Sequence, residues 1–420
     1  MRFIAGALIA SLLAGCGPVA RAGIVVAPEP SVVDLSILEP WTPTGQAGRV
    51  HTGPGLSMLP YPNSASVQRR LLGRAFEVEE ERVFAQPALQ RLGAFGFALS
   101  DGAQAQLETI MPGPVMAAYR AALVGKVAPV EASDIAALIP PEFPLSESIA
   151  YDVSTSRYFS MSIADSTLIT SQDAAEWHEV ALAGGGRPMG LAIDASRRLL
   201  WVTMGRMGEE ADAFVGLVAV DIDTLAEARR IPAAATSLND VTVAADGSVF
   251  ASDSLGGGIY RFATGAETVE RLDEELTFRS PQGIALHPSG RYAYISDYSY
   301  GLALFALESR LAYRIDGPEN LMLDGVDGLF LHEEHGLIAI QNGVSPHRIM
   351  AFTLSTDGTR ITRATTLERA HGEWGEPTTG QLVNGALLYI SNPQWDRFDE
   401  NGLLQGDAPL QANIVRRLPL

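Results

Sequence analysis

The chain has 420 residues, of which 47% are hydrophobic and 19% are charged, so its composition is that of a globular protein and not of a disordered one. The formal net charge of -19 argues against nucleic acid as a partner, because a phosphate backbone requires clustered lysine and arginine. A single cysteine, Cys16, excludes a disulfide within the chain.

The first residues predict a targeting segment. Arg2 supplies a short charged region, and residues 3–13 form an apolar stretch that is too short to span a bilayer. This stretch ends in the string LAGC (13–16), which resembles a bacterial lipobox. The resemblance implies a lipoprotein signal peptide over residues 1–15 and lipid attachment to Cys16, in the bacterial cell envelope. The alternative is an ordinary signal peptide with an incidental cysteine.

The residues after the predicted lipidation site bear on location. By the pattern of such lipoproteins, Gly17 implies an outer-membrane protein that faces the periplasm. Residues 16–63 are rich in proline and glycine and predict a flexible tether. A tether of this length would let the folded part reach well away from the membrane.

Residues 64–142 mix apolar and charged side chains at roughly helical spacing, which predicts a partly helical N-terminal extension. Within it, Asp134 is expected to cap a short helix over the string IAALI, which Pro140 and Pro141 would end. The extension has a second possible role, since it could supply a strand to the domain that follows.

From residue 143 to residue 420 one pattern occurs six times: an apolar strand, a turn and a second apolar strand. Equivalent positions are 42, 50, 43, 45 and 49 residues apart. Repeats of this period built from short strands indicate a β-propeller with one blade per repeat, so the predicted fold class is all-β, a six-bladed β-propeller over 143–420. The sixth repeat ends one strand short of four, and an upstream segment is expected to close the ring.

The first strand of each blade should begin at the mouth of the central channel. One equivalent residue per blade would face that mouth: Glu147, Met189, Asn239, Gln282, Asp327 and Glu376. Five of the six carry side-chain oxygens and three are carboxylates, a set that suits a hard divalent ion, Ca²⁺ above all. The alternative is a ring of solvated polar residues around a water-filled channel.

The ends of the second strands form another ring at this mouth, which includes Asp253, Asp297, Asn342 and Asn392. These side chains could face a ligand. They could equally accept hydrogen bonds from the backbone of neighbouring loops, as polar residues at strand ends do.

Four strings resemble the SMP-30/gluconolactonase/LRE-like family of six-bladed propellers: SESIAYD (146–152), LNDVTVAADG (238–247), SPQGIALHPSGRYAYISD (280–297) and VDGLFL (326–331). The resemblance implies one divalent ion in the channel, held by Glu147, Asn239 and Asp327. The family's second asparagine is replaced here by Gln282, which keeps the amide oxygen on a longer arm. Glu376 is an additional candidate ligand by our own inference.

The function that the resemblance implies is a metal-dependent hydrolase of a small-molecule lactone or ester, with Asp327 as the candidate catalytic base. A second candidate catalytic residue is His371, in the loop that enters the sixth blade. The candidate substrate-binding residues are Arg187, Asp240, Asp297 and Trp374. For each of these the alternative is an ordinary surface or packing residue.

A function of another class remains open, that of a non-catalytic, lipid-anchored propeller that binds a protein or glycan partner in the cell envelope. Met189 and Gln282 favour this alternative because they depart from an all-oxygen ring and from the family pattern. The N-terminal extension favours it as well, since a minimal lactonase would not need one.

Overall fold

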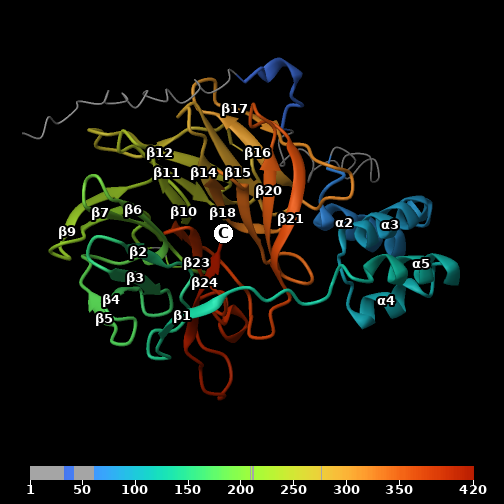
Figure 1. Ribbon diagram of the computed structural model, residues 1–420, viewed down its shortest axis with the longest axis horizontal. Helices are drawn as coiled ribbons and strands as arrows, with labels where there is room; N and C mark the ends of the chain where they lie inside the picture. Colours follow the sequence, from blue (N-terminus) through green and yellow to red (C-terminus); the bar gives the residue numbers. More distant parts are fainter. Residues whose placement is uncertain (1–32, 42–60, 209, 211, 276) are drawn as a thin grey trace, which may run out of the picture.

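The computed structural model describes residues 33–41, 61–208, 210, 212–275 and 277–420. Six four-stranded antiparallel sheets surround a central axis, with helices to one side (Figure 1). The predicted six-bladed β-propeller with a partly helical N-terminal extension is confirmed. The predicted signal peptide and the lipidation site Cys16 lie outside the described residues. Among the helices of the described ranges, none is both long and apolar enough to cross a bilayer.

Five blades are each built from four consecutive strands. Blade one has β2 (Ala150–Asp152), β3 (Arg157–Ser162), β4 (Thr167–Ser171) and β5 (His178–Val180). Blade two has β6 (Arg187–Asp194), β7 (Leu199–Gly205), β8 (Gly216–Asp221) and β9 (Glu227–Pro232). Blade three has β10 (Leu238–Val243), β11 (Val249–Asp253), β12 (Gly258–Phe262) and β13 (Glu270–Arg271). Blade four has β14 (Pro281–Leu286), β15 (Tyr292–Asp297), β16 (Gly301–Ala306) and β17 (Leu311–Arg314). Blade five has β18 (Val326–His332), β19 (Gly336–Gln341), β20 (Arg348–Leu354) and β21 (Ile361–Arg369).

The sixth blade combines three strands near the C-terminus with one strand from the segment that precedes blade one. Its strands are β22 (Gly380–Val383), β23 (Ala386–Ile390), β24 (Asn413–Pro419) and, outermost, β1 (Asp134–Ile139). Strand β1 pairs antiparallel with β24, from Asp134 opposite Arg417 to Ile139 opposite Asn413. The expected upstream strand therefore exists and closes the ring.

The helix expected over residues 135–139 is wrong, because this segment is strand β1. A short apolar run fits a strand as well as a helix, and the unpaired backbone of β24 decides between them by offering a ladder of hydrogen bonds. Ile139 is fully buried in the core shared by blades six and one. The prolines at 140 and 141 end the strand as they would have ended a helix.

The apolar core lies between neighbouring blades. One cluster of buried residues joins blades one and two, another joins two and three, and others join four with five, five with six, and six with one. The first strands contact one another around the axis. Each sheet is therefore buried on both faces, and the inner ends of the first strands are held rigidly around the channel.

The extension is helical as predicted, with α2 (Ala65–Glu77), η3 (Glu79–Phe84), α3 (Ala85–Phe95), α4 (Asp101–Leu107) and α5 (Gly113–Leu123). Its buried face shares a core cluster with blades three and four, through residues such as Leu71, Leu89, Phe278 and Phe305. The helices lie beside the propeller next to blade five (Figure 1). This large shared core fixes the extension to the propeller.

Two buried charges of the propeller face the ends of these helices. The carboxylate of Asp324 accepts hydrogen bonds from Ala65 N and Ser66 N, each at 2.8 Å, at the start of α2. The guanidinium of Arg348 donates to Phe95 O, at the end of α3, at 3.1 Å. An anion at a helix N-terminus and a cation at a C-terminus both complement the helix dipole. The docking is therefore electrostatic as well as apolar.

Part of the predicted tether is ordered. Residues 33–41 include the short helix η1 (Leu35–Ile37) and lie along the outer edge of blade four. Trp41 N donates to Ala312 O at 2.9 Å, and its indole nitrogen donates to Thr277 O at 3.0 Å. The prediction of a flexible tether over all of 16–63 is thus wrong for this part, because Trp41 gains a buried position and a partner for its N–H.

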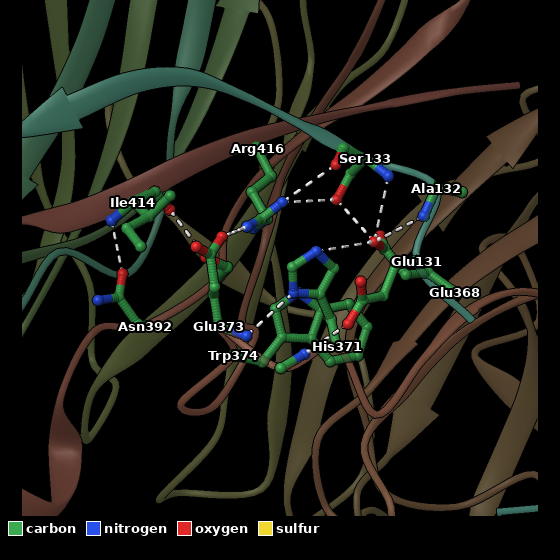
Figure 2. A network of polar contacts seen from close by, with 12 residues as sticks. Glu131, Ala132, Ser133, Glu368, His371, Glu373, Trp374, Asn392, Ile414 and Arg416 are labelled. Atoms are coloured by element: carbon green, nitrogen blue, oxygen red, sulfur yellow. Dashed lines mark hydrogen bonds and ion pairs between the residues drawn. The ribbon is translucent and has the colours of Figure 1, made fainter. Parts of the chain in front are cut away.

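A polar network joins blades five and six to the segment before β1 (Figure 2). At its centre Glu368, at the end of β21, is fully buried. One carboxylate oxygen accepts from Ala132 N, Ser133 N and Ser133 Oγ, and the other accepts from the Tyr389 hydroxyl at 2.8 Å. The buried guanidinium of Arg416, on β24, donates to Ser133 O at 3.1 Å. Glu368 therefore anchors the closing strand.

Replacing this carboxylate should loosen the ring closure. We expect Glu368→Gln to lower the free energy of unfolding by about 2 kcal/mol, because buried donors lose a charged acceptor. Glu131→Gln is the matched control, since Glu131 is an exposed carboxylate of the same network that accepts one hydrogen bond, from Gly372 N. Urea unfolding of both variants measures the difference. Equal losses would show that Glu368 is not the anchor.

Candidate functional site

A bulge at the start of the first strand aims one residue per blade at the channel. In blades two to five the pairing of the first two strands shifts between Pro188 and Leu191, Leu238 and Val241, Pro281 and Ile284, and Val326 and Leu329. The ring residues Met189, Asn239, Gln282 and Asp327 each fall inside such a shift. A bulge bends the strand and redirects a side chain, so these residues leave the sheet face and point toward the mouth.

The residue after the ring residue meets the next blade. At Gly283 a Cβ would lie 2.5 Å from the Cβ of Leu329, and at Gly190 it would lie 2.3 Å from Asn239 O. Glycine is therefore required by close approach at these positions. Blade three has Asp240 instead, and its carboxylate accepts a hydrogen bond from Ile284 N at 3.0 Å. Asp240 is thus turned toward blade four, below the ring.

The six ring residues line one cavity of about 570 Å³ at the channel mouth, the central cavity. Its wall also includes Arg206, Met207, Leu255, Tyr298, Asn342, Trp395 and Glu400. All five predicted metal-binding residues, Glu147, Asn239, Gln282, Asp327 and Glu376, are therefore brought to one space. The cavity is large enough for a small-molecule ligand.

The carboxylates of the central cavity oppose one another's ionisation. Burial raises the pKa of Asp327 to about 7, and nearby Glu376 adds to the rise. Burial raises the pKa of Glu147 well above its usual value, and the negative charge of Asp327 raises it further. The pKa of Asp240 is also raised to about 7, mainly by burial. These groups remain ionised together only if a cation balances them.

Hydrogen bonds orient the two buried carboxylates of the central cavity. Asn342 Nδ2 donates to Asp327 Oδ2 at 2.6 Å, and the Tyr298 hydroxyl donates to Asn342 Oδ1 at 2.8 Å. The indole nitrogen of Trp395 donates to Glu147 Oε2 at 2.8 Å. Within the described residues, the other oxygen of each carboxylate accepts no hydrogen bond, and that oxygen is the one available to a ligand.

The donor chemistry fits a hard divalent ion. Among the described residues, no three His, Cys, Asp or Glu side chains converge as one metal-ligand group. An ion here would therefore need amide oxygens beside the carboxylates of Glu147 and Asp327. Asn239 and Gln282 carry such oxygens, and Asn239 Nδ2 donates to Gln282 Oε1. A mixed carboxylate and amide shell is typical of Ca²⁺.

Arg187 is not free to bind a substrate. Its guanidinium is paired with Glu210 and donates to Ile163 O and Ala164 O, at 2.8 and 3.0 Å, and to Asn401 O at 3.2 Å. These contacts join loops of blades one, two and six around the mouth. Arg187 is thus a positioning residue. The arginine that lines the central cavity is Arg206, just after β7. The sequence pattern did not predict that Arg206, and not Arg187, would face the cavity.

Asp297 also serves the backbone and not a ligand. It is fully buried, and its carboxylate accepts from Arg279 N at 2.6 Å and from Ser299 N at 3.1 Å. Asp253 does the same for Thr236 N and Ser237 N. Of the four strand-end residues named from the sequence, only Asn342 lines the central cavity. For Asp253 and Asp297 the backbone alternative is the one that the structure supports.

His371 and Trp374 lie apart from the central cavity, in the polar network around Glu368 (Figure 2). Their rings stack with centroids 6.0 Å apart, and Trp374 Nε1 donates to the Tyr389 hydroxyl at 3.0 Å. His371 Nε2 lies 3.9 Å from Glu368 Oε1. The expectation that His371 is catalytic and Trp374 binds substrate is corrected on this ground, because neither side chain reaches the ring.

The sequence reasoning missed Tyr298 as a site residue. It follows β15 directly, and its hydroxyl reaches the mouth through Asn342. A signal was present, since Tyr298 comes after the strand-end Asp297 where a turn back to the next strand must begin. Glu400 was missed as well, because it belongs to the long loop between β23 and β24, which has no counterpart in the other repeats.

Comparisons with known proteins give likenesses of structure only. No protein-family model matches the chain, and no curated protein matches it in sequence. A gluconolactonase from Xanthomonas campestris is similar with a TM-score of 0.47 and 16% identity, over 69% of this chain and 95% of that one. A luciferin-regenerating enzyme gives 0.46 and 14%, over 70% and 96%. Regucalcin from Agrobacterium tumefaciens, a calcium-binding protein, gives 0.45 and 16%, over 68% and 93%.

Two of these neighbours carry the names of the family that the repeats resemble, so the expected resemblance is confirmed among the structural neighbours. The six-bladed architecture follows from the strand order of this chain and does not depend on the likenesses.

The raised pKa values predict how stability depends on pH in the metal-free protein. A carboxyl group whose pKa is higher in the folded chain holds its proton more tightly there, so the free energy of unfolding falls as pH rises from about 4 to about 7. We expect Asp327→Asn to remove part of this fall, and to be more stable than the parent by on the order of 2–4 kcal/mol at about pH 8 but not at about pH 4.5.

Urea unfolding in the presence of a chelator, at both pH values, measures the free energy of unfolding of the parent, of Asp327→Asn and of a control variant. Asp357→Asn is the control of opposite sign, because hydrogen bonding to Ser355 lowers the pKa of Asp357. Its loss should cost stability above about pH 4. A difference between Asp327→Asn and parent that does not change with pH would contradict the assignment.

Proposed function

We propose that the protein is a hydrolase of a small-molecule lactone or ester that depends on a divalent metal ion, Ca²⁺ in the first place. The observation that carries the proposal is the convergence of buried carboxylates and amide oxygens on one cavity of about 570 Å³. Such a set is costly without a cation, and a cation beside an open cavity is a site for carbonyl chemistry.

Glu147, Asn239 and Asp327 would hold the ion, with Gln282 and Glu376 as further oxygen donors. When bound, the ion would polarise the carbonyl of the substrate and lower the pKa of a water molecule. Asp327 accepts a proton from the attacking water, whose oxygen bonds to the carbonyl carbon. The bond between that carbon and the ring or ester oxygen then breaks. Asp327 returns the proton to the departing oxygen, which leaves a hydroxy acid, or an acid and an alcohol.

The surrounding residues keep this geometry. Asn342 donates to one oxygen of Asp327 and so leaves the other to face the cavity. Tyr298 fixes the orientation of the Asn342 amide, since its hydroxyl donates to the amide oxygen. Trp395 holds Glu147 in the same way. With three side chains preset by neighbours, little conformational freedom is lost when a ligand binds.

The proposal includes a place in the cell. Cys16 would carry a lipid, and the catalytic domain would act from the outer membrane on small molecules of the periplasm. Segment 33–41 is held against blade four, so the span between the proposed lipid and the propeller would be residues 16–32.

A binding function is the second candidate, and one observation favours it. Asn239 and Gln282 are hydrogen-bonded to each other, so the side-chain oxygen of Gln282 already has a partner within the protein. In that case the central cavity would receive a group of a protein or glycan and no reaction would follow.

Calcium titration decides between the two. In calorimetry at about pH 7 we expect the protein to bind Ca²⁺ with release of protons, because burial raises the pKa of Asp327 to about 7, so the heat varies with the ionisation heat of the buffer. Asp327→Asn should weaken binding about tenfold or more, and Asp357→Asn should leave it unchanged. The loaded protein should then hydrolyse lactones or aryl esters. No binding of Ca²⁺, Mg²⁺, Mn²⁺ or Zn²⁺ would overturn the hydrolase proposal.

A further inference from the structure

A second cavity, of about 560 Å³, lies between the helical extension and the mouth of the propeller, and we name it the side chamber. The extension contributes Arg69 of α2, Phe97 between α3 and α4, and Ala103 of α4. The propeller contributes Tyr298, Asn342 and Val344. The chamber is about as large as the central cavity. None of the six ring residues and no residue of a first strand lines it. Strand β1 closes the ring without any helix of the extension. The side chamber therefore gives the helices a role that ring closure does not explain.

The two cavities share a wall. Tyr298 and Asn342 line both, and Asn342 donates to Asp327 on the side of the central cavity. A molecule whose reacting carbonyl lies at Asp327 therefore has the side chamber as neighbouring space for whatever it carries beyond that carbonyl. The pair that orients the candidate base is also the pair that such a substituent would touch.

The chamber has rigid walls. Arg348 donates to Phe95 O at 3.1 Å, and Ala98 N donates to Ser345 O at 2.7 Å, which fixes the chain on both sides of Phe97. The Tyr119 hydroxyl donates to Phe97 O and accepts from Leu99 N, each at 2.8 Å. The chamber is thus formed before any ligand arrives, which lowers the entropic cost of filling it.

The chamber has an apolar side, a few polar groups and one cation. Phe97, Ala98, Leu99, Ala103 and Val344 form the apolar side. Ser100 and Ser345 add hydroxyl groups, and Arg69 is the one charged residue among the described lining residues. The Arg69 guanidinium lies 5.5 Å from the centroid of the Phe97 ring, and no ion pair joins it to a carboxylate within the described ranges. In a chain of net charge -19, an arginine that lines a partly apolar cavity and has no acidic partner among the described residues is a site for an anion.

We propose that the side chamber binds the arm of the substrate, and that this arm is an apolar chain that ends in an anionic group held by Arg69. The inference rests on the proposed function, since it places the reacting ester or lactone at the central cavity. It deepens that function by naming the substrate class, which is an acyl compound with a remote carboxylate or comparable anion.

Three para-nitrophenyl esters test it with calcium present: the acetate, which has no arm, the octanoate, which has an apolar arm, and the mono-ester of suberic acid, whose arm has the same length and ends in a carboxylate. The protein should favour the suberate ester through a lower KM. Arg69→Gln should raise KM for the suberate ester alone by about tenfold, the effect of losing one hydrogen bond to a charged group. Arg69→Lys, which keeps the charge, should restore part of it.

Filling the chamber gives an independent variant. Ala103→Trp should raise KM for the octanoate and suberate esters and leave acetate unchanged, because only the arms need the space. Ala105→Trp is the matched control on the same helix, since Ala105 is exposed and does not line the chamber. Equal effects of Arg69→Gln and Ala103→Trp on all three esters, or no effect on any, would overturn the proposal.

Binding separates this failure from failure of the proposed function. If none of the esters is hydrolysed, calorimetric titration with suberate and with octanoate still examines the chamber in parent and variants. Suberate binding that weakens about tenfold in Arg69→Gln, and is lost in Ala103→Trp but kept in Ala105→Trp, supports the chamber as an anion-ended binding site without the reaction. No suberate binding to the parent overturns it.

Discussion

The pairing of β1 with β24 is the interaction on which the rest of this structure depends. The last blade is complete only with this pairing, because its outermost strand comes from residues 134–139 and covers the edge of β24. The closure holds the first strands at fixed positions around the channel. It also brings the buried Glu368 and Arg416 into the network that joins blades five and six. The geometry of the ring residues follows from it.

Inside this closed frame the chain tolerates an arrangement that is unfavourable by itself. Glu147, Asp327 and Asp240 are buried near one another, and their raised pKa values report that cost. Stability would be served by replacing them with apolar residues, as blade two does with Met189. The carboxylates are therefore best explained by what they bind, and the rigidity of the surrounding blades is what keeps them together.

The repeat spacing predicted the blades and the ring because both are set locally, by a strand, a turn and a bulge at one position of each repeat. What could not be predicted depends on contacts between distant residues. The string IAALI became a strand because β24 lies beside it, and Arg187 was taken up by Glu210 and carbonyl groups of other blades. His371 and Trp374 share a loop with Glu376, yet only the last reaches the cavity. Closeness along a loop does not show into which cavity each side chain points.

The same closure has a kinetic consequence. Ser133 and Arg416 are 283 positions apart, so the last blade assembles only after nearly all of the chain is available. Contacts of such separation are slow to form, because closing a long loop costs entropy before the contact returns any free energy. Until then β24 and β23 present an open apolar edge. In a protein made from its N-terminus, blades one to five can form in order, while β1 must wait for β24 at the other end of the chain.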